Sequence, residues 1–274
     1  MKKIVKLLFL IFLALLIMNC AGKKPKTYED FNIYYQKGQK YYEKEKWLKA
    51  VDNFRLYILN NPGGELADDA QFYLGECYFN RKEYLLAVAE FTQLVERYKY
   101  SELLIDGYYK IAHSYYKLSP RYERDQENTE MALRQLQEFI DSYPGTDYAQ
   151  KATKNIDELR NKLGRKLYES AKIYRKLSQW DAAILYCDEM LNSYYDSEWA
   201  VWAKYEKAYC YIKKREFDNF AVVETDIKSD ESLNQNKKGE MLAKLEKMNI
   251  KEKQKIEKEK RKKLGKERRK TWWF

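Results

Sequence analysis

The stretch Gly38-Gln39-Lys40-Tyr41, in which a small residue is followed three positions later by tyrosine, recurs along this chain. The other copies are Gly75-x-x-Tyr78, Ala112-x-x-Tyr115, Ala171-x-x-Tyr174 and Ala208-x-x-Tyr211. The small residues are separated by 37, 37, 59 and 37 positions. A period of about 30 to 40 residues is typical of arrays of helical repeats.

The residues around this pattern repeat with it. Nine positions after the small residue lies an aromatic residue, twelve after it an alanine, and sixteen after it a bulky apolar residue or cysteine. These residues are Trp47, Tyr84, Trp180 and Phe217; Ala50, Ala87 and Ala183; and Phe54, Phe91 and Cys187. Repeat one also has Pro62 where its second helix should stop. This is the tetratricopeptide pattern, in which the small residues mark where two antiparallel helices approach most closely.

We therefore predict an all-α fold, an α-solenoid of about five tetratricopeptide repeats over residues 31–225. A long helix should join repeats three and four, from a cap at Thr146 or Asp147 to about Leu177. It would divide the array into an N-terminal half, about 31–145, and a C-terminal half, about 146–225. Repeat three should contain a charged loop, Ser119 to Glu130, and repeat five a weak second helix.

The positive charge is concentrated at the two ends of the sequence. The net charge is +10, of which residues 250–270 contribute +8 and the first nineteen residues +3. The stretch between them is close to neutral, so a nucleic-acid role would have to depend on the tail alone.

No pattern of residues indicates catalysis. The sequence has no glycine-rich phosphate loop, no metal-ligand spacing and no Ser/His/Asp arrangement. We expect no metal and no cofactor, and we expect His113, the only histidine, to be solvated. Three cysteines within the repeats, Cys77, Cys187 and Cys210, are interpreted as core residues, although the odd number leaves a free thiol as an alternative.

The N-terminus is typical of an exported protein. Residues 1–19 combine three lysines with a short apolar run, which indicates a signal peptide rather than a membrane span. Cys20 follows directly and resembles a bacterial lipobox cysteine, although Asn19 replaces the usual small residue. That reading implies cleavage before Cys20 and lipid attachment to it, with 20–30 as a polar tether. The alternative is an ordinary cysteine beside a signal cut elsewhere.

One face of the array is predicted to carry aromatic residues. They are Tyr35, Tyr42, Phe72, Phe79, Tyr109 and Tyr116. In this class of repeat these positions point into the concave groove, where aromatic rings would suit an extended or helical peptide. Replacing both Tyr35 and Phe72 with alanine should then weaken peptide binding. The alternative is that the rings only fill space between neighbouring repeats.

The tail, residues 226–274, is rich in Lys and Glu and should be either a solvated helix with little core to pack on or disordered. Its last residues, Trp272, Trp273 and Phe274, follow a basic stretch. Such a segment favours a membrane interface or a docking partner, with a flexible end as the alternative.

Several segments between residues 124 and 191 resemble the outer-membrane protein assembly factor BamD family. They are Arg124-Asp125-Gln126, Glu138 to Pro144, the helix through Lys154 to Leu163, and Tyr168 to Tyr174 with Trp180. With the lipobox cysteine and the five repeats, the resemblance covers about 20–225.

This resemblance implies a lipoprotein at the cell outer membrane that faces the periplasm and belongs to the β-barrel assembly machine. Its C-terminal repeats would bind the POTRA domains of the insertase. Its N-terminal repeats would bind the aromatic-rich C-terminal signals of unfolded outer-membrane proteins, and other assembly lipoproteins are possible partners.

Other functions remain open at this point. The first is a general periplasmic scaffold of the Tol–Pal, cell-division coordinator type, against which Cys20 and the early start of the repeats argue. The second is an enzyme, for which no motif is present. The third is a binder of anionic lipid or polymer that acts through the tail.

Overall fold

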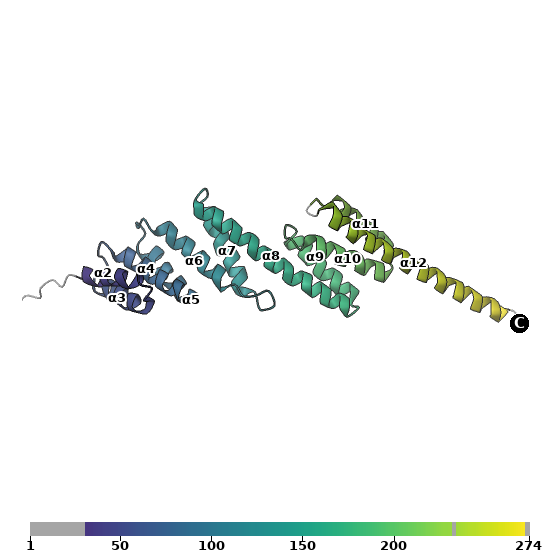
Figure 1. Cartoon of the computed structure of the whole chain (residues 1–274), viewed down its shortest axis with the longest axis horizontal. Coiled ribbons are helices and arrows are strands. Elements are labelled where there is room, and N and C mark those ends of the chain that lie inside the picture. Colours follow the sequence, from purple (N-terminus) through teal and green to yellow (C-terminus); the bar gives the residue numbers. More distant parts are fainter. Residues whose placement is uncertain (1–30, 232–233, 272–274) are drawn as a thin grey trace, which may run out of the picture. The chain divides into compact units, whose positions relative to one another are not determined.

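The structure is a computed structural model that describes residues 31–231 and 234–271, with side chains up to residue 267. The predicted signal peptide, Cys20 and the tether lie outside the described residues, as do Trp272 to Phe274. All the regular structure of the described residues is α-helical (Figure 1). Contacts divide the chain into two compact units, residues 1–103 and 104–274.

The first unit contains two helical pairs, which are repeats one and two. Their helices are α2 (Asn32–Tyr42), α3 (Trp47–Asn60), α4 (Ala67–Asn80) and α5 (Tyr84–Arg97). In each pair the glycine lies against the aromatic ring of the second helix. A Cβ on Gly38 would lie 2.7 Å from the Phe54 ring, and one on Gly75 would lie 2.6 Å from the Phe91 ring. The prediction that the repeated small residue marks the closest approach of the two helices is thus confirmed in both pairs.

The second unit contains repeats three to five and the tail helix. Its helices are α6 (Leu104–Leu118), α7 (Glu127–Ser142), α8 (Asp147–Lys176), α9 (Trp180–Ser193), α10 (Ala200–Lys214), α11 (Phe217–Ser229) and α12 (Gln235–Thr271). Repeat three therefore belongs to the same unit as repeats four and five.

The predicted long helix is α8, which has 30 residues. Thr146 is its N-cap, and the Thr146 hydroxyl accepts a hydrogen bond from the Ala149 amide over 3.1 Å. One face of α8 packs on α7 and another on α9, so that a single helix serves repeats three and four.

The loop in the enlarged hairpin of repeat three is shorter than the predicted Ser119 to Glu130, because α7 already begins at Glu127. Gln126 and Thr129 are buried, and the Gln126 side chain donates to the carbonyl oxygens of Arg121 and Arg124 over 2.9 Å. Lys162 of α8 donates to the Ser119 hydroxyl over 2.7 Å. The stretch predicted as a loop therefore includes the first turn of α7. The carboxylates of Glu127 and Glu130 lie there and interact favourably with the helix dipole.

The end of the chain differs most from expectation. Helix α11 is a complete second helix of repeat five, with Phe220, Val223 and Ile227 buried. The tail helix α12 is not merely solvated, because Leu245 is fully buried in the core that α10 and α11 form. The prediction of little core to pack on was wrong for residues 238–256, since sparse apolar residues at helical spacing are enough to cover the exposed end of a solenoid.

The three repeat cysteines are buried, as predicted, and each is a free thiol. Burial raises the pKa of Cys77 and Cys210 to about 12, so neither thiol ionises near neutral pH. Their role is packing.

Candidate binding surfaces

The aromatic residues predicted to line a groove divide between the two units. Tyr35, Tyr42, Phe72 and Phe79 belong to the first unit, and Tyr109 and Tyr116 to the second. Each set is therefore described separately.

In the first unit Tyr35 is a core residue. Its side chain is only 6% exposed and packs on Phe54 and Tyr57, with ring centroids 5.9 and 5.7 Å away. Its hydroxyl oxygen accepts a hydrogen bond from the Gln39 amide over 2.7 Å. Tyr35 thus holds α2 against α3, and little of its ring is available to a ligand.

Tyr42, Phe72 and Phe79 are only partly buried and lie on the first helices of their repeats. The Tyr42 ring contacts Trp47 and Tyr73 edge-on, each at 5.1 Å. Tyr73 also contacts Phe72, whose ring lies 5.6 Å from Phe91. Four rings, Trp47, Tyr42, Tyr73 and Phe72, therefore form a continuous row across α2, α3 and α4, which we call the aromatic row.

Tyr73 is a member that sequence reasoning missed. It does not occupy the repeat position used to choose the candidates, and it stacks on Phe54 with an interplanar angle of 13°. The only signal available was its place beside Phe72. Phe79 lies apart from the row and packs on Tyr84 at 5.3 Å.

In the second unit Tyr109 and Tyr116 enclose His113. The His113 ring stacks on both, with each centroid 5.5 Å away, and Tyr109 also stacks on Tyr148 at 4.3 Å. Tyr109 is 7% exposed, whereas Tyr116 is partly buried and its hydroxyl donates to Glu158. These rings join α6 to α8.

The expectation that His113 is solvated was wrong. Burial lowers the pKa of His113 to about 4, and Lys117, Lys110 and Lys151 lower it further. The Asn155 amide nitrogen lies 3.3 Å from its Nδ1 atom. The neutral His113 ring therefore packs between two tyrosines, a role that the spacing of residues along the sequence did not predict.

The second unit also has a surface hollow of 470 Å³ where the repeat-three hairpin meets α8 and the loop between α9 and α10. Arg165 of α8 lies over the Tyr122 ring at 4.4 Å and over the Trp199 ring at 5.3 Å. Lys162 and Glu158 also line the hollow. The mixture of charges suits a polar protein surface rather than a small apolar ligand.

Over the described residues, no group of three or more His, Cys, Asp or Glu side chains could hold a metal ion. None of the described helices combines the length and apolar character needed to cross a bilayer.

The repeat geometry defines a helical-repeat protein of the tetratricopeptide class. The chain belongs to the YfiO family, described as outer membrane lipoprotein, whose sequence profile matches residues 29–224.

Its relatives include proteins named outer membrane protein assembly factor BamD. The one from Caulobacter vibrioides is 27% identical over 179 residues, which cover 64% of this chain and 59% of that protein. The one from Rickettsia prowazekii is 25% identical over 213 residues, which cover 77% of this chain and 85% of that protein. This chain therefore spans less than two thirds of the Caulobacter relative.

The solved structures to which this chain is similar share less sequence identity with it than these relatives do. A tetratricopeptide-repeat protein from Bacteroides fragilis is 15% identical with a TM-score of 0.43, covering 80% of this chain and 99% of that one. The TPR2AB domain of yeast Sti1 is 13% identical with a TM-score of 0.36, covering 80% of this chain and 98% of that one.

Proposed function

We propose that this protein is a non-catalytic scaffold of the β-barrel assembly machine, held at the outer membrane and facing the periplasm. The observation that carries the proposal is the similarity of the repeat array to proteins named outer membrane protein assembly factor BamD, with the YfiO family matching residues 29–224. A solenoid of paired helices with half-exposed rings suits the binding of other polypeptides.

The proposed anchor is Cys20, acylated after removal of residues 1–19. Metabolic labelling with palmitate checks it, because the wild-type protein should take up label and remain with outer membranes. Cys20→Ala should lose both properties, while Cys77→Ala should keep them because Cys77 is a buried core thiol. Retention of label by Cys20→Ala would place the lipid elsewhere.

We propose that the aromatic row of the first unit binds the C-terminal signals of unfolded outer-membrane proteins. Such signals are rich in aromatic residues, and a row of rings offers them stacking partners at low conformational cost. The double change Tyr42→Ala with Phe72→Ala should lower the affinity for a synthetic signal peptide at least about tenfold. Phe79, together with Tyr109 and Tyr116 of the second unit, remains a candidate for further peptide contacts.

The matched control is Tyr100→Ala, which removes an aromatic side chain that is fully exposed, at 102%. It should bind the peptide as the wild type does. Tyr35→Ala is unsuitable as a binding test, because the loss of a core ring would weaken the fold itself. Equal peptide affinity for the double variant and the control would refute the aromatic row as the site.

The proposed partner of the C-terminal repeats is the POTRA-bearing insertase. Affinity purification of the full-length protein from detergent-solubilised outer membranes should recover that insertase in stoichiometric amount. Recovery of Tol–Pal or cell-wall proteins in its place, at low and moderate salt, would instead favour a general periplasmic scaffold.

A further inference from the structure

The distal part of α12 carries dense positive charge. From Lys260 to Lys270 the sequence has eight basic residues and one glutamate, and we call this stretch the basic segment. The described side chains in it are exposed, apart from the partly buried Gly265. Such a segment attracts an anionic partner over several ångströms in low salt.

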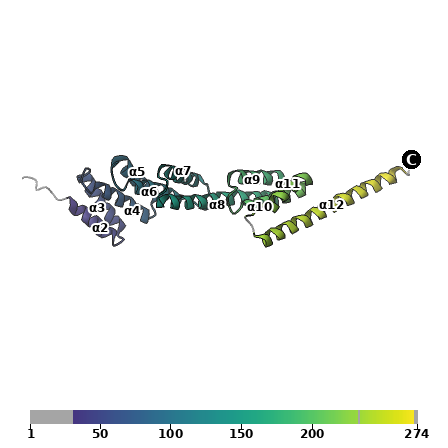
Figure 2. The same cartoon turned by 90° about the horizontal axis from the view of Figure 1, so that it is seen from above.

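The proximal part of the same helix is fixed to repeat five. Leu245 is fully buried in the contact with α10 and α11, and Met241 of the same helix is 5% exposed. The Lys238 ammonium donates to the Lys228 carbonyl oxygen over 3.2 Å. The basic segment therefore continues from a docked helix, and Figure 2 shows α12 extending beyond α10 and α11.

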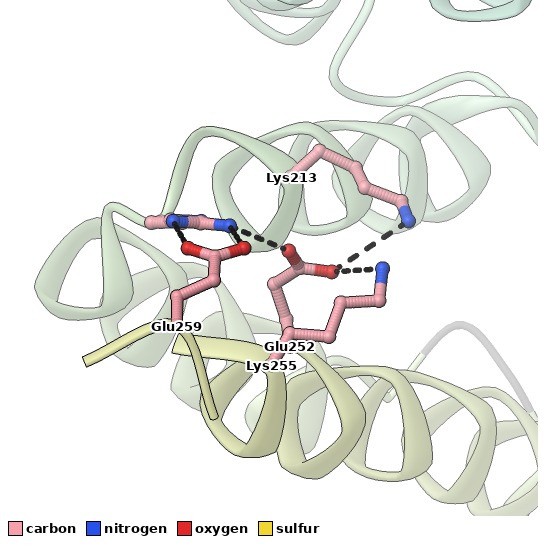
Figure 3. Close-up of polar contacts among 5 residues, drawn as sticks. Lys213, Glu252, Lys255 and Glu259 are labelled. Atoms are coloured by element: carbon pink, nitrogen blue, oxygen red, sulfur yellow. Dashed lines mark hydrogen bonds and ion pairs between the residues drawn. The ribbon is translucent and has the colours of Figure 1, made fainter. Parts of the chain in front are cut away.

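A group of ion pairs ends the docked part just before the basic segment begins (Figure 3). Arg215, at the end of α10, donates to both carboxylate oxygens of Glu259 over 2.9 and 3.0 Å. The carboxylate of Glu252, 7% exposed, lies 3.5 Å from Arg215 and 3.1 Å from Lys255. The direction in which the helix leaves the repeats is thus set one residue before Lys260.

The basic residues of the segment surround the helix. At 100° per residue, Lys260, Arg261, Lys262 and Lys263 point in widely different directions. Leu264 is the only apolar residue among them, so the segment has no apolar face to insert into a bilayer. This arrangement suits a surface with many anionic groups rather than a single phosphate.

The residues that follow favour a lipid surface over a soluble polyanion. The sequence continues Thr271-Trp272-Trp273-Phe274, and tryptophan is enriched where membrane meets water. A basic stretch joined to such residues combines two weak membrane signals, which together bind more stably than either alone.

We propose that the basic segment binds the headgroups of anionic phospholipids and gives the protein a second membrane contact. This inference rests on the proposed function only in that the protein lies at a membrane. It does not depend on binding to the insertase. The docked part of α12 would then hold the repeats at a defined distance from the lipid surface.

The test uses the full-length protein carrying Leu264→Cys, a position that is 55% exposed, labelled with a fluorophore. Cys77, Cys187 and Cys210 are buried, and the thiol of Cys20 is blocked in the acylated protein, so the new thiol is the reactive one. Energy transfer to a rhodamine lipid is measured on phosphatidylcholine vesicles and on 3:1 phosphatidylcholine–phosphatidylglycerol vesicles. The fraction of labelled segments at the surface should rise at least about tenfold with phosphatidylglycerol and fall again in 1 M salt.

The critical variant changes Lys260, Lys262, Lys263 and Lys266 to glutamine, which keeps helix propensity. It should lose the response to phosphatidylglycerol. The matched control makes the same change at four exposed lysines elsewhere, Lys40, Lys44, Lys99 and Lys154, and should keep the response.

Equal energy transfer on the two kinds of vesicle, or an undiminished response in the critical variant, would overturn the proposal. Displacement by soluble polyglutamate, at a charge concentration far below that of the lipid, would identify an acidic protein as the partner instead. Co-purification of the insertase with the critical variant is measured in parallel. If the insertase is retained while the lipid response is absent even in the wild type, the inference fails and the proposed function stands.

Discussion

The guanidinium of Arg215 donates two hydrogen bonds to the carboxylate of Glu259 and so joins the end of α10 to α12. Arg215 adopts the left-handed backbone conformation, with φ of 64°, as it closes α10. One residue therefore both ends the first helix of repeat five and positions the tail helix.

This arrangement predicts two separable effects on α12. Leu245→Ala should destabilise the second unit by about 2 to 4 kcal/mol, because a fully buried leucine leaves a cavity. Arg215→Gln should cost much less than Leu245→Ala, since exposed ion pairs contribute little to stability. Thermal unfolding checks the first effect, and hydrogen exchange of residues 252–259 checks the second. A larger loss of stability with Arg215→Gln than with Leu245→Ala would contradict the assignment of the docking energy to apolar packing.

The repeated small residue makes a second prediction. Gly38→Ala and Gly75→Ala should each destabilise the first unit by about 1 to 3 kcal/mol, because the new Cβ would overlap the Phe54 or Phe91 ring. Gly239→Ala is the control, since nothing lies within 4 Å of a Cβ there. It should be neutral or stabilising by up to about 1 kcal/mol, as alanine favours a helix over glycine. Denaturant titration of the three variants measures this, and a stabilised Gly38→Ala would show that the helices are not in close contact.

His113 predicts how stability depends on pH. Its pKa is about 4 in the folded protein, against 6.5 for an unperturbed histidine. The unfolded chain therefore takes up a proton first, and stability should fall as pH drops from about 6.5 towards 4. His113→Phe keeps a ring between Tyr109 and Tyr116 but removes this titration.

Chemical denaturation of the wild type and His113→Phe at pH 7.5, 5.5 and 4.5 checks the prediction. The wild type should lose stability relative to the variant across the series. A constant difference between the two proteins would mean that His113 titrates alike in the folded and unfolded states.

A buried ion pair in the second unit makes the last prediction. Arg175 of α8 pairs with Glu206 of α10, whose side chain is 6% exposed, and also lies over the Tyr209 ring at 4.9 Å. Burial raises the pKa of Glu206, an effect that the charge of Arg175 opposes. Arg175→Met should destabilise the unit by about 3 to 5 kcal/mol, since it leaves a buried carboxylate without its partner.

The double variant Arg175→Met with Glu206→Leu should recover most of that loss, because apolar pairs of similar volume replace buried ion pairs at little cost. A double-mutant cycle by thermal unfolding measures the coupling. Additive losses in the double variant would show that the two side chains act independently.

Much of the fold could be predicted because its signals are local. The small residues and the rings that pack on them recur at a fixed spacing, and Thr146 marks the start of α8 by chemistry within one turn. The candidate rings were harder to sort. Tyr35 and Phe72 occupy equivalent repeat positions, yet Tyr35 is buried while Phe72 is partly exposed, because the packing of neighbouring helices differs.

The sequence by itself determined the repeat architecture, the long helix and the concentration of charge in the tail, since each depends on residue spacing along one or two helices. Only the tertiary structure decided that Tyr73 completes the aromatic row, that His113 is enclosed by two tyrosines, and that α12 packs on repeat five through Leu245. The physical reason is that burial and pKa depend on which side chains distant in sequence share a contact. A periodic pattern predicts the face of a helix but not the partner that covers it.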